Sequence, residues 1–327
     1  MYRAKVKIAS LLSLLLFSTV MLFSACSMPS HINCGDGSLK IVTTIFPQYD
    51  FARQIGKDKV SLKMLVTPGG ESHSYEPTPQ DIIAVRDCDI FITSGGESDV
   101  WSKAILNSID TSDITVISLM DCIDALEEEI SEGMSEKLPV GEEEETEYDE
   151  HVWTSPKNAK AISKAITEAM INADSANSDF YLSNFEEYES KLDQLDSDYR
   201  NAIHNAKEKT VIFGDRFPFR YLFEEYGLNY YAAFPGCSTD SDVSAKTMMF
   251  LIDKIKENDL SAVFYIEFSA RKIADTISSE TGAEPLLFHS CHTVSKEDFE
   301  SGVTYIDLMK NNLENLKRGL NIDADRM

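Results

Sequence analysis

Three histidines lie at turns of the chain, next to predicted strands or helices. His73 follows a Gly-Gly pair, His151 precedes Val-Trp, and His289 follows a short apolar run. Turns of this kind gather ligand-binding side chains at the edge of a sheet in α/β proteins. Imidazole is the commonest metal ligand, and zinc accepts three imidazoles with a fourth donor. Because the chain has only six histidines, this placement predicts a metal site.

Two of these histidines also have simpler interpretations. His151 follows a run of acidic residues and could be a solvated histidine, whereas His289 could be a satisfied histidine at the edge of the core. Cys291 and His292 are nearby competitors as ligands. Glu267, at the end of a predicted strand, could hydrogen-bond a ligating imidazole.

The elements that must position these residues alternate in type along the chain. Short β-rich runs bounded by glycine and proline predict strands over residues 39–44, 60–66, 89–93, 115–119, 211–213, 230–234, 262–266 and 285–288. Helices are predicted over residues 48–56, 79–86, 100–108, 221–226, 245–257, 270–281 and 305–320. The alternation predicts an α/β fold with two lobes, each a mainly parallel sheet with helices on both faces.

One helix is predicted to be much longer than the others. Apolar residues recur at intervals of four and three from Tyr181 to Tyr199, with charged residues between them. Over residues 178–207 this helix would span roughly 45 Å. A coiled-coil partner would explain the stripe, but the flanking α/β halves favour a strut that joins them. The predicted lobes are then residues 39–177 and 208–327.

The first 25 residues are typical of an export signal. Three basic residues precede an apolar run that ends at Phe23, and Ser24-Ala25-Cys26 follows. The run is too short for a comfortable membrane span. It resembles a bacterial lipobox, in which Cys26 becomes lipid-modified after cleavage; an ordinary secretory signal with an incidental cysteine is the alternative. Residues 26–38 would form a flexible tether to the membrane, which predicts a lipid-anchored protein outside the cytoplasm.

The chain is strongly acidic. Its formal net charge is −25, or −28 once the three basic residues of the leader are removed. This charge argues against nucleic acid as a partner and against direct attachment to anionic lipid. Residues 127–150 hold twelve acids and one base, and we interpret them as a solvated insertion in the first lobe. The alternative is a flap that collects cations, because the segment runs directly into His151.

Several motifs, taken in order, resemble those of the zinc- and manganese-binding solute-binding lipoproteins of bacterial ABC importers, the metal-binding cluster A-I type. They are residues 41–47 (IVTTIFP), 69–79 (GGESHSYEPTP), 151–156 (HVWTSP), 226–228 (YGL) and 280–283 (ETGA). The resemblance implies two α/β lobes joined by one long helix, with the metal between them. It implies that His73 and His151 are ligands and that His289 replaces an aspartate at the end of the last strand.

The remaining ligand position departs from the family pattern. Counting back from Tyr226-Gly227-Leu228 places Arg216 where the family has histidine or glutamate. An arginine has no lone pair to offer a metal. Asp215, one residue earlier, could coordinate if the turn is reshaped, as Pro218 suggests. The alternative is an ion pair of Asp215 with Arg216 or Arg220.

The resemblance implies a protein that captures a divalent metal and delivers it to an ABC permease, without catalysis, and we expect it to be a monomer. Three imidazoles with one carboxylate or water favour zinc, whereas manganese prefers more oxygen donors. A manganese-specific protein of the same type is the first alternative. A metal-dependent hydrolase is a second, but no HExxH or GxSxG motif is present. A third is a surface adhesin whose metal only stabilises it.

Overall fold

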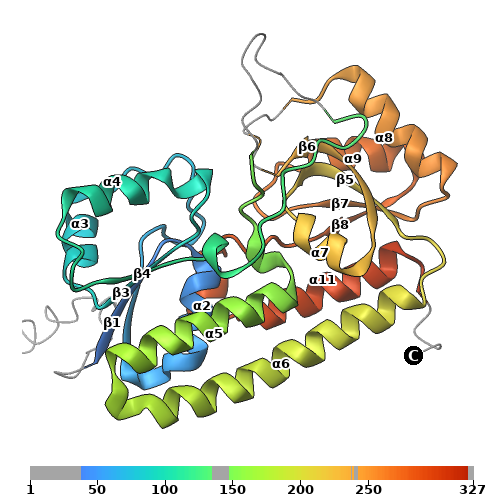
Figure 1. The fold of residues 1–327 in the computed structure, drawn as a ribbon. Coiled ribbons are helices and arrows are strands. Elements are labelled where there is room, and N and C mark those ends of the chain that lie inside the picture. Colours follow the sequence, from blue (N-terminus) through green and yellow to red (C-terminus); the bar gives the residue numbers. More distant parts are fainter. Residues whose placement is uncertain (1–37, 135–146, 237, 239–241, 323–327) are drawn as a thin grey trace, which may run out of the picture. The chain divides into compact units, whose positions relative to one another are not determined.

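The computed structural model describes residues 38–134, 147–236, 238 and 242–322, and Figure 1 shows how they fold. The predicted leader, Cys26 and its tether, and the centre of the acidic segment lie outside these residues. Within the described residues, no helix is long and apolar enough to cross a lipid bilayer.

The first sheet consists of four parallel strands in the order β2-β1-β3-β4. The strands are β1 (Leu39–Thr43), β2 (Val60–Met64), β3 (Ile90–Thr93) and β4 (Thr115–Ser118). The helices of this half are α2 (Phe46–Gly56), α3 (Pro79–Arg86), α4 (Val100–Ser108) and α5 (Pro156–Ala173). The chain steps outward from β1 to β2 and returns to β3 on the other side. The loops therefore diverge at the carboxyl ends of the inner strands, where α/β sheets place ligands.

The second sheet repeats this order, as β6-β5-β7-β8, and all its strands are parallel. Its strands are β5 (Thr210–Phe217), β6 (Asn229–Pro235), β7 (Ala262–Tyr265) and β8 (Glu284–Leu287). Its helices are α7 (Arg220–Tyr226), α8 (Ala245–Glu257), α9 (Lys272–Thr281), α10 (Lys296–Ser301) and α11 (Tyr305–Gly319). The predicted fold of two parallel α/β sheets is confirmed.

Helix α6 (Ser178–His204) joins the two sheets and ends three residues before the predicted end. The residues of the predicted apolar stripe are buried: Tyr181, Phe185, Tyr188, Leu192, Leu195 and Tyr199. The helix packs against α2 and α5 of the first half and against α11 of the second. The Tyr199 hydroxyl donates to the Met309 carbonyl over 2.8 Å. The stripe therefore faces other parts of the same chain, which makes α6 the expected strut.

A buried carboxylate also connects α2 to the start of α11. Asp50 is fully buried, and one of its oxygens accepts a hydrogen bond from the backbone N–H of Tyr305 over 2.7 Å. Its other oxygen accepts from Arg53 over 2.6 Å. The Arg53 guanidinium in turn donates to the Val303 carbonyl over 2.6 Å. These bonds join the first half to the last helix of the chain at a point remote in sequence.

The described ends of the acidic segment lie against α7 of the second half. Glu127 and Tyr148 form an antiparallel bridge. The Tyr221 hydroxyl accepts a hydrogen bond from the Leu126 N–H over 3.1 Å and donates to the Asp149 carbonyl over 2.6 Å. The two described ends of the segment are therefore held close together by one tyrosine, next to the residues that precede His151.

The largest differences from the sequence predictions concern three elements. Helices α5 and α10 were not predicted, although α5 begins with a proline in its first turn, a common helix start. Strand β5 continues through Phe217 because a register shift between Phe213 and Arg216 lets it resume pairing with β6. Gly214 sits inside that strand, where a Cβ would lie 2.8 Å from the backbone of Ala274 in α9. The glycine that suggested a strand end is needed instead for close packing of sheet and helix.

Candidate metal centre

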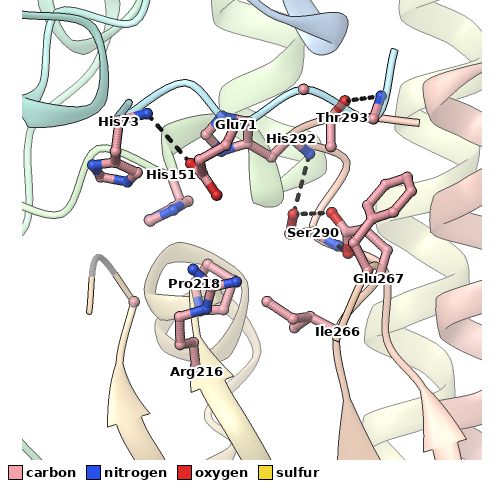
Figure 2. A pocket seen from close by; sticks show the side chains of 14 residues that line it. Glu71, His73, His151, Arg216, Pro218, Ile266, Glu267, Ser290, His292 and Thr293 are labelled. Atoms are coloured by element: carbon pink, nitrogen blue, oxygen red, sulfur yellow. Dashed lines mark hydrogen bonds between the residues drawn. The ribbon is translucent and has the colours of Figure 1, made fainter. Parts of the chain in front are cut away.

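A cavity of about 90 Å³ lies at the carboxyl ends of the strands of both sheets. From the first half it is lined by Gly69, Gly70, Glu71, His73 and His151. From the second it is lined by Arg216, Pro218, Gly236, Ile266, Glu267, Phe268, Ser290, His292 and Thr293. Figure 2 shows Glu71, His73 and His151 on one side of the cavity, with Arg216, Pro218 and Ile266 across from them. The site is therefore assembled from loops of both sheets.

His73 lies on the loop that follows β2, and aromatic contacts hold that loop in place. The rings of Tyr75 and Trp101 have centroids 4.7 Å apart, and the Trp101 indole N–H donates to the Ser72 carbonyl over 3.1 Å. The His73 side chain is 23% exposed, and its Nε2 lies 3.8 Å from a carboxylate oxygen of buried Glu150. The imidazole is thus accessible from the cavity and faces a negative charge.

His151 is buried just before α5, and Asp149 fixes its orientation. One oxygen of Asp149 accepts from the His151 backbone N–H over 2.7 Å and lies 3.1 Å from its Nδ1. Burial by itself would lower the pKa of His151, but the charge and hydrogen bond of Asp149, with Glu150 and Glu128, outweigh it and raise the pKa. A carboxylate on Nδ1 leaves Nε2 as the nitrogen for a metal, which is the arrangement that metal-binding histidines usually have.

His292 is the third imidazole of the cavity. Its Nε2 lies 2.7 Å from the Ser72 hydroxyl, and its backbone N–H donates to the Ser290 hydroxyl over 3.1 Å. Burial, and then the charges of His151, His73 and Arg216, lower the pKa of His292 to about 3. The ring is therefore neutral at physiological pH and keeps a lone pair, as a metal ligand must.

This depressed pKa predicts acid sensitivity of the metal-free protein. An unfolded histidine takes up a proton near pH 6.5, whereas folded His292 resists protonation until about pH 3. Its contribution to stability is complete above pH 6.5 and is lost as the pH falls toward 3. Allowing for solvent at the cavity, we expect a loss of about 2 kcal/mol between pH 7 and 4.5. Urea unfolding of chelated wild-type and His292→Gln protein at both pH values measures it; an equal loss in both would contradict the expectation.

His289 and Asp215, two of the predicted ligands, are not among the residues that line the cavity. The Nδ1 of His289 accepts a hydrogen bond from the Cys291 N–H over 2.9 Å, and its own backbone N–H donates to Asn312 over 2.6 Å. The two carboxylate oxygens of Asp215 accept from the backbone N–H groups of Arg216 and Ile266. Both side chains therefore stabilise the strand ends around the cavity.

Glu267, which we expected to orient an imidazole, instead holds the turn that carries His292. Its two oxygens accept hydrogen bonds from the backbone N–H and the hydroxyl of Ser290. Its carboxylate lies 3.7 Å from Nδ1 of His289. The Ser290 carbonyl then accepts from the Trp153 indole over 2.9 Å. The loop after β8 is thereby tied both to β7 and to the segment that follows His151.

The histidines converge without forming a finished coordination shell. The rings of His151 and His292 have centroids 6.3 Å apart, and both lie against the Trp153 ring. Among the described residues, no three His, Cys, Asp or Glu side chains are grouped closely enough to hold a metal together. Their chemistry nevertheless fits zinc, because three imidazoles face one cavity and a buried one is neutral. Binding therefore requires small side-chain or loop movements that bring the three nitrogens together.

The comparisons with known proteins identify the family. The family model of the zinc-uptake complex component A, periplasmic (ZnuA) matches residues 41–319. The high-affinity zinc uptake system protein ZnuA of Bacillus subtilis (strain 168) is 34% identical over 315 residues, covering 92% of this chain and 94% of the relative.

Solved structures show the same fold. The metal-dependent lipoprotein YcdH from Bacillus subtilis is 32% identical, with a TM-score of 0.73 over 86% of this chain and 99% of that one. The Zn(II)-bound ZnuA-like domain of Streptococcus pneumoniae AdcA is 28% identical, with a TM-score of 0.71 over 87% of this chain and all of that one. The family is one of metal-uptake components, which confirms the expectation of a binding protein over an enzyme. The chain belongs to the ZnuA family of zinc-uptake components.

Proposed function

We propose that this protein captures a zinc ion as cargo outside the cytoplasm and delivers it to an ABC permease for import. The observation that carries the proposal is the convergence of three imidazoles, from both halves of the chain, on one cavity between the sheets. Neutral imidazoles suit zinc better than manganese, which prefers oxygen donors. The zinc proteins among its relatives support the choice of metal.

The ligand set we propose is His73, His151 and His292, with the fourth position open to another donor. This replaces the sequence-based set at two positions. His289 and Asp215 accept backbone hydrogen bonds and are not among the residues that line the cavity, whereas His292 is. Three protein ligands with one open position are typical of zinc sites that exchange a ligand, while structural zinc sites are closed by four protein ligands.

Attachment to the membrane through a lipid on Cys26 is part of the same proposal. It rests on the lipobox-like Phe23-Ser24-Ala25-Cys26 and on the lipoprotein named among the structural relatives. Mass spectrometry of protein purified from membranes would show the diacylglyceryl modification on Cys26. Release of an unmodified chain into the medium, cleaved at another residue, would contradict it.

Metal content and competition test the function itself. Purified protein should bind one zinc per chain, bind it reversibly, and prefer zinc to manganese in a titration against a chromogenic chelator. His73→Ala and His151→Ala should each lose this binding, whereas His204→Ala, on the exposed end of α6, should keep it. A wild-type protein without stoichiometric metal, or one that releases metal only on unfolding, would contradict an uptake role.

Asp149 offers a separate prediction about how His151 is prepared. Replacing Asp149 by Asn removes the negative charge beside Nδ1 of His151. Loss of a carboxylate that orients a ligating histidine typically costs about 10–100-fold in metal affinity, and we expect a loss in that range. Competition titration measures it. Asp307→Asn, which changes an exposed capping carboxylate on α11, is the control; equal losses in both variants would exclude a specific role for Asp149.

A further inference from the structure

Arg216 places a permanent positive charge in the same cavity as the three imidazoles. It lies near the end of β5, after the register shift. One oxygen of the neighbouring Asp215 accepts a hydrogen bond from the Arg216 N–H over 2.9 Å, and the other accepts from the Ile266 N–H over 3.3 Å. The Asp215 carboxylate thereby stabilises the irregular strand end that turns Arg216 into the cavity. Figure 2 shows the Arg216 side chain reaching from this strand toward the histidines across the cavity.

A metal and a guanidinium in one small cavity repel each other. A divalent ion about 6 Å from a unit charge meets a repulsion of about 5 kcal/mol at an effective dielectric constant of 20. Imidazole ligands carry no negative charge, so they do not reduce the metal's charge. Arg216 itself has no lone pair to bind the ion. An anion between Arg216 and the metal would offset this repulsion where it is strongest.

Of the four carboxylate oxygens that line the cavity, three accept hydrogen bonds from backbone or hydroxyl groups. Both oxygens of Glu267 bond to Ser290, and one oxygen of exposed Glu71 accepts from the His73 N–H over 3.3 Å. In the part of the chain that the structure describes, Arg216 has no ion pair with a carboxylate; its Nη1 donates to the Ser238 carbonyl over 3.4 Å. Most N–H groups of the Arg216 guanidinium therefore remain available to donate hydrogen bonds to a ligand.

We propose that the cargo is bound as a zinc–oxyanion pair: a small carboxylate, carbonate or phosphate group takes zinc's fourth position through one oxygen and is held by Arg216 through another. This deepens the proposed function and rests on it. The planar fork of arginine matches oxyanions with two parallel hydrogen bonds. A water needs about 10–15 Å³, so a cavity of about 90 Å³ has room for a metal ion together with a small anion.

The test compares zinc affinity in perchlorate alone with zinc affinity after millimolar acetate, bicarbonate or phosphate is added. Free zinc and ionic strength are held fixed. For the wild type we expect zinc affinity to rise about 10-fold with at least one oxyanion. The anion that gives the largest rise identifies the chemical class of the bound oxyanion. Arg216→Gln should lose this dependence, while Arg216→Lys should keep part of it. Arg220→Gln, which changes an arginine outside the cavity that pairs with Glu129 and Glu224, should retain it.

Cobalt provides a readout of the coordination itself. The visible spectrum of the Co²⁺ protein should change on addition of the preferred oxyanion in the wild type and stay unchanged in Arg216→Gln. Equal zinc affinity with and without oxyanions would overturn the pair. An oxyanion dependence of zinc affinity that persists in Arg216→Gln would also overturn it. A change of the cobalt spectrum in Glu71→Gln that shows loss of the fourth ligand would overturn it too, because the fourth position would then belong to Glu71. Absence of zinc binding under every condition would instead overturn the proposed function.

Discussion

Replacing His292 with alanine is expected to weaken zinc binding at least about 100-fold, while His289→Ala leaves the affinity within a few-fold of wild type. His292 lies in the cavity with a neutral ring, so its loss removes a metal bond. Residues that merely orient a ligand are worth about 10–100-fold, and a ligand should exceed that range. The Nδ1 of His289 accepts a hydrogen bond from the Cys291 N–H, so loss of the His289 side chain should affect local stability more than zinc affinity.

The pair of variants separates two histidines that lie three residues apart on one loop. Affinities should be measured by competition with a chelator at a pH near 7.5, where both imidazoles are neutral in the unfolded chain. Circular dichroism at the same temperature establishes that each variant is folded. The reverse result, with His289→Ala losing zinc and His292→Ala keeping it, would restore the sequence-based ligand and refute the one proposed from the cavity.

Replacing Asp50 with alanine is expected to lower the free energy of unfolding by about 3–5 kcal/mol, the range for removing one partner of a buried ion pair. Asp50 is fully buried between α2 and α11, and its loss leaves the Tyr305 N–H and part of Arg53 without an acceptor. The effect should appear without metal, because Asp50 does not line the cavity.

Urea unfolding of the chelated protein measures this loss. Asp307→Ala is a matched control, since Asp307 caps the same helix from an exposed position through Thr304 and loss of such a contact costs about 1 kcal/mol. A loss for Asp50→Ala no larger than for the control would show that the connection between α2 and α11 contributes little to stability.

Much of the fold follows from local signals in the sequence. Helix α3 begins and ends at the predicted residues because Thr78 and Asp81 cap it reciprocally and Pro79 occupies its first turn. The apolar stripe of α6 likewise predicted both the helix and its buried face. The end of β5 was harder to predict, because its register shift depends on Asp215 bonding to the neighbouring strand's end, a contact between residues distant in sequence.

Local signals leave the choice between His289 and His292 open. A strand predicted to end at Phe288 put His289 at the sheet edge, where ligands gather. The chain instead turns at Cys291, whose φ of 62° is unusual for a residue other than glycine or asparagine. That turn, held by bonds from Glu267 and His289, brings His292 into the cavity. No residue type signals it, whereas the turns that place His73 and His151 carry glycines or a helix start.

The long helix and its neighbours have a consequence for dividing the protein. One continuous apolar cluster includes Ile41 and Ile90 from the first sheet and Phe213 and Phe264 from the second. Helix α6 contributes one face to that cluster along its length, from Tyr181 to Tyr199. A fragment cut before or after α6 would expose this face to water. The two sheets are repeats in topology, yet neither half is a self-sufficient module that could be expressed or exchanged alone.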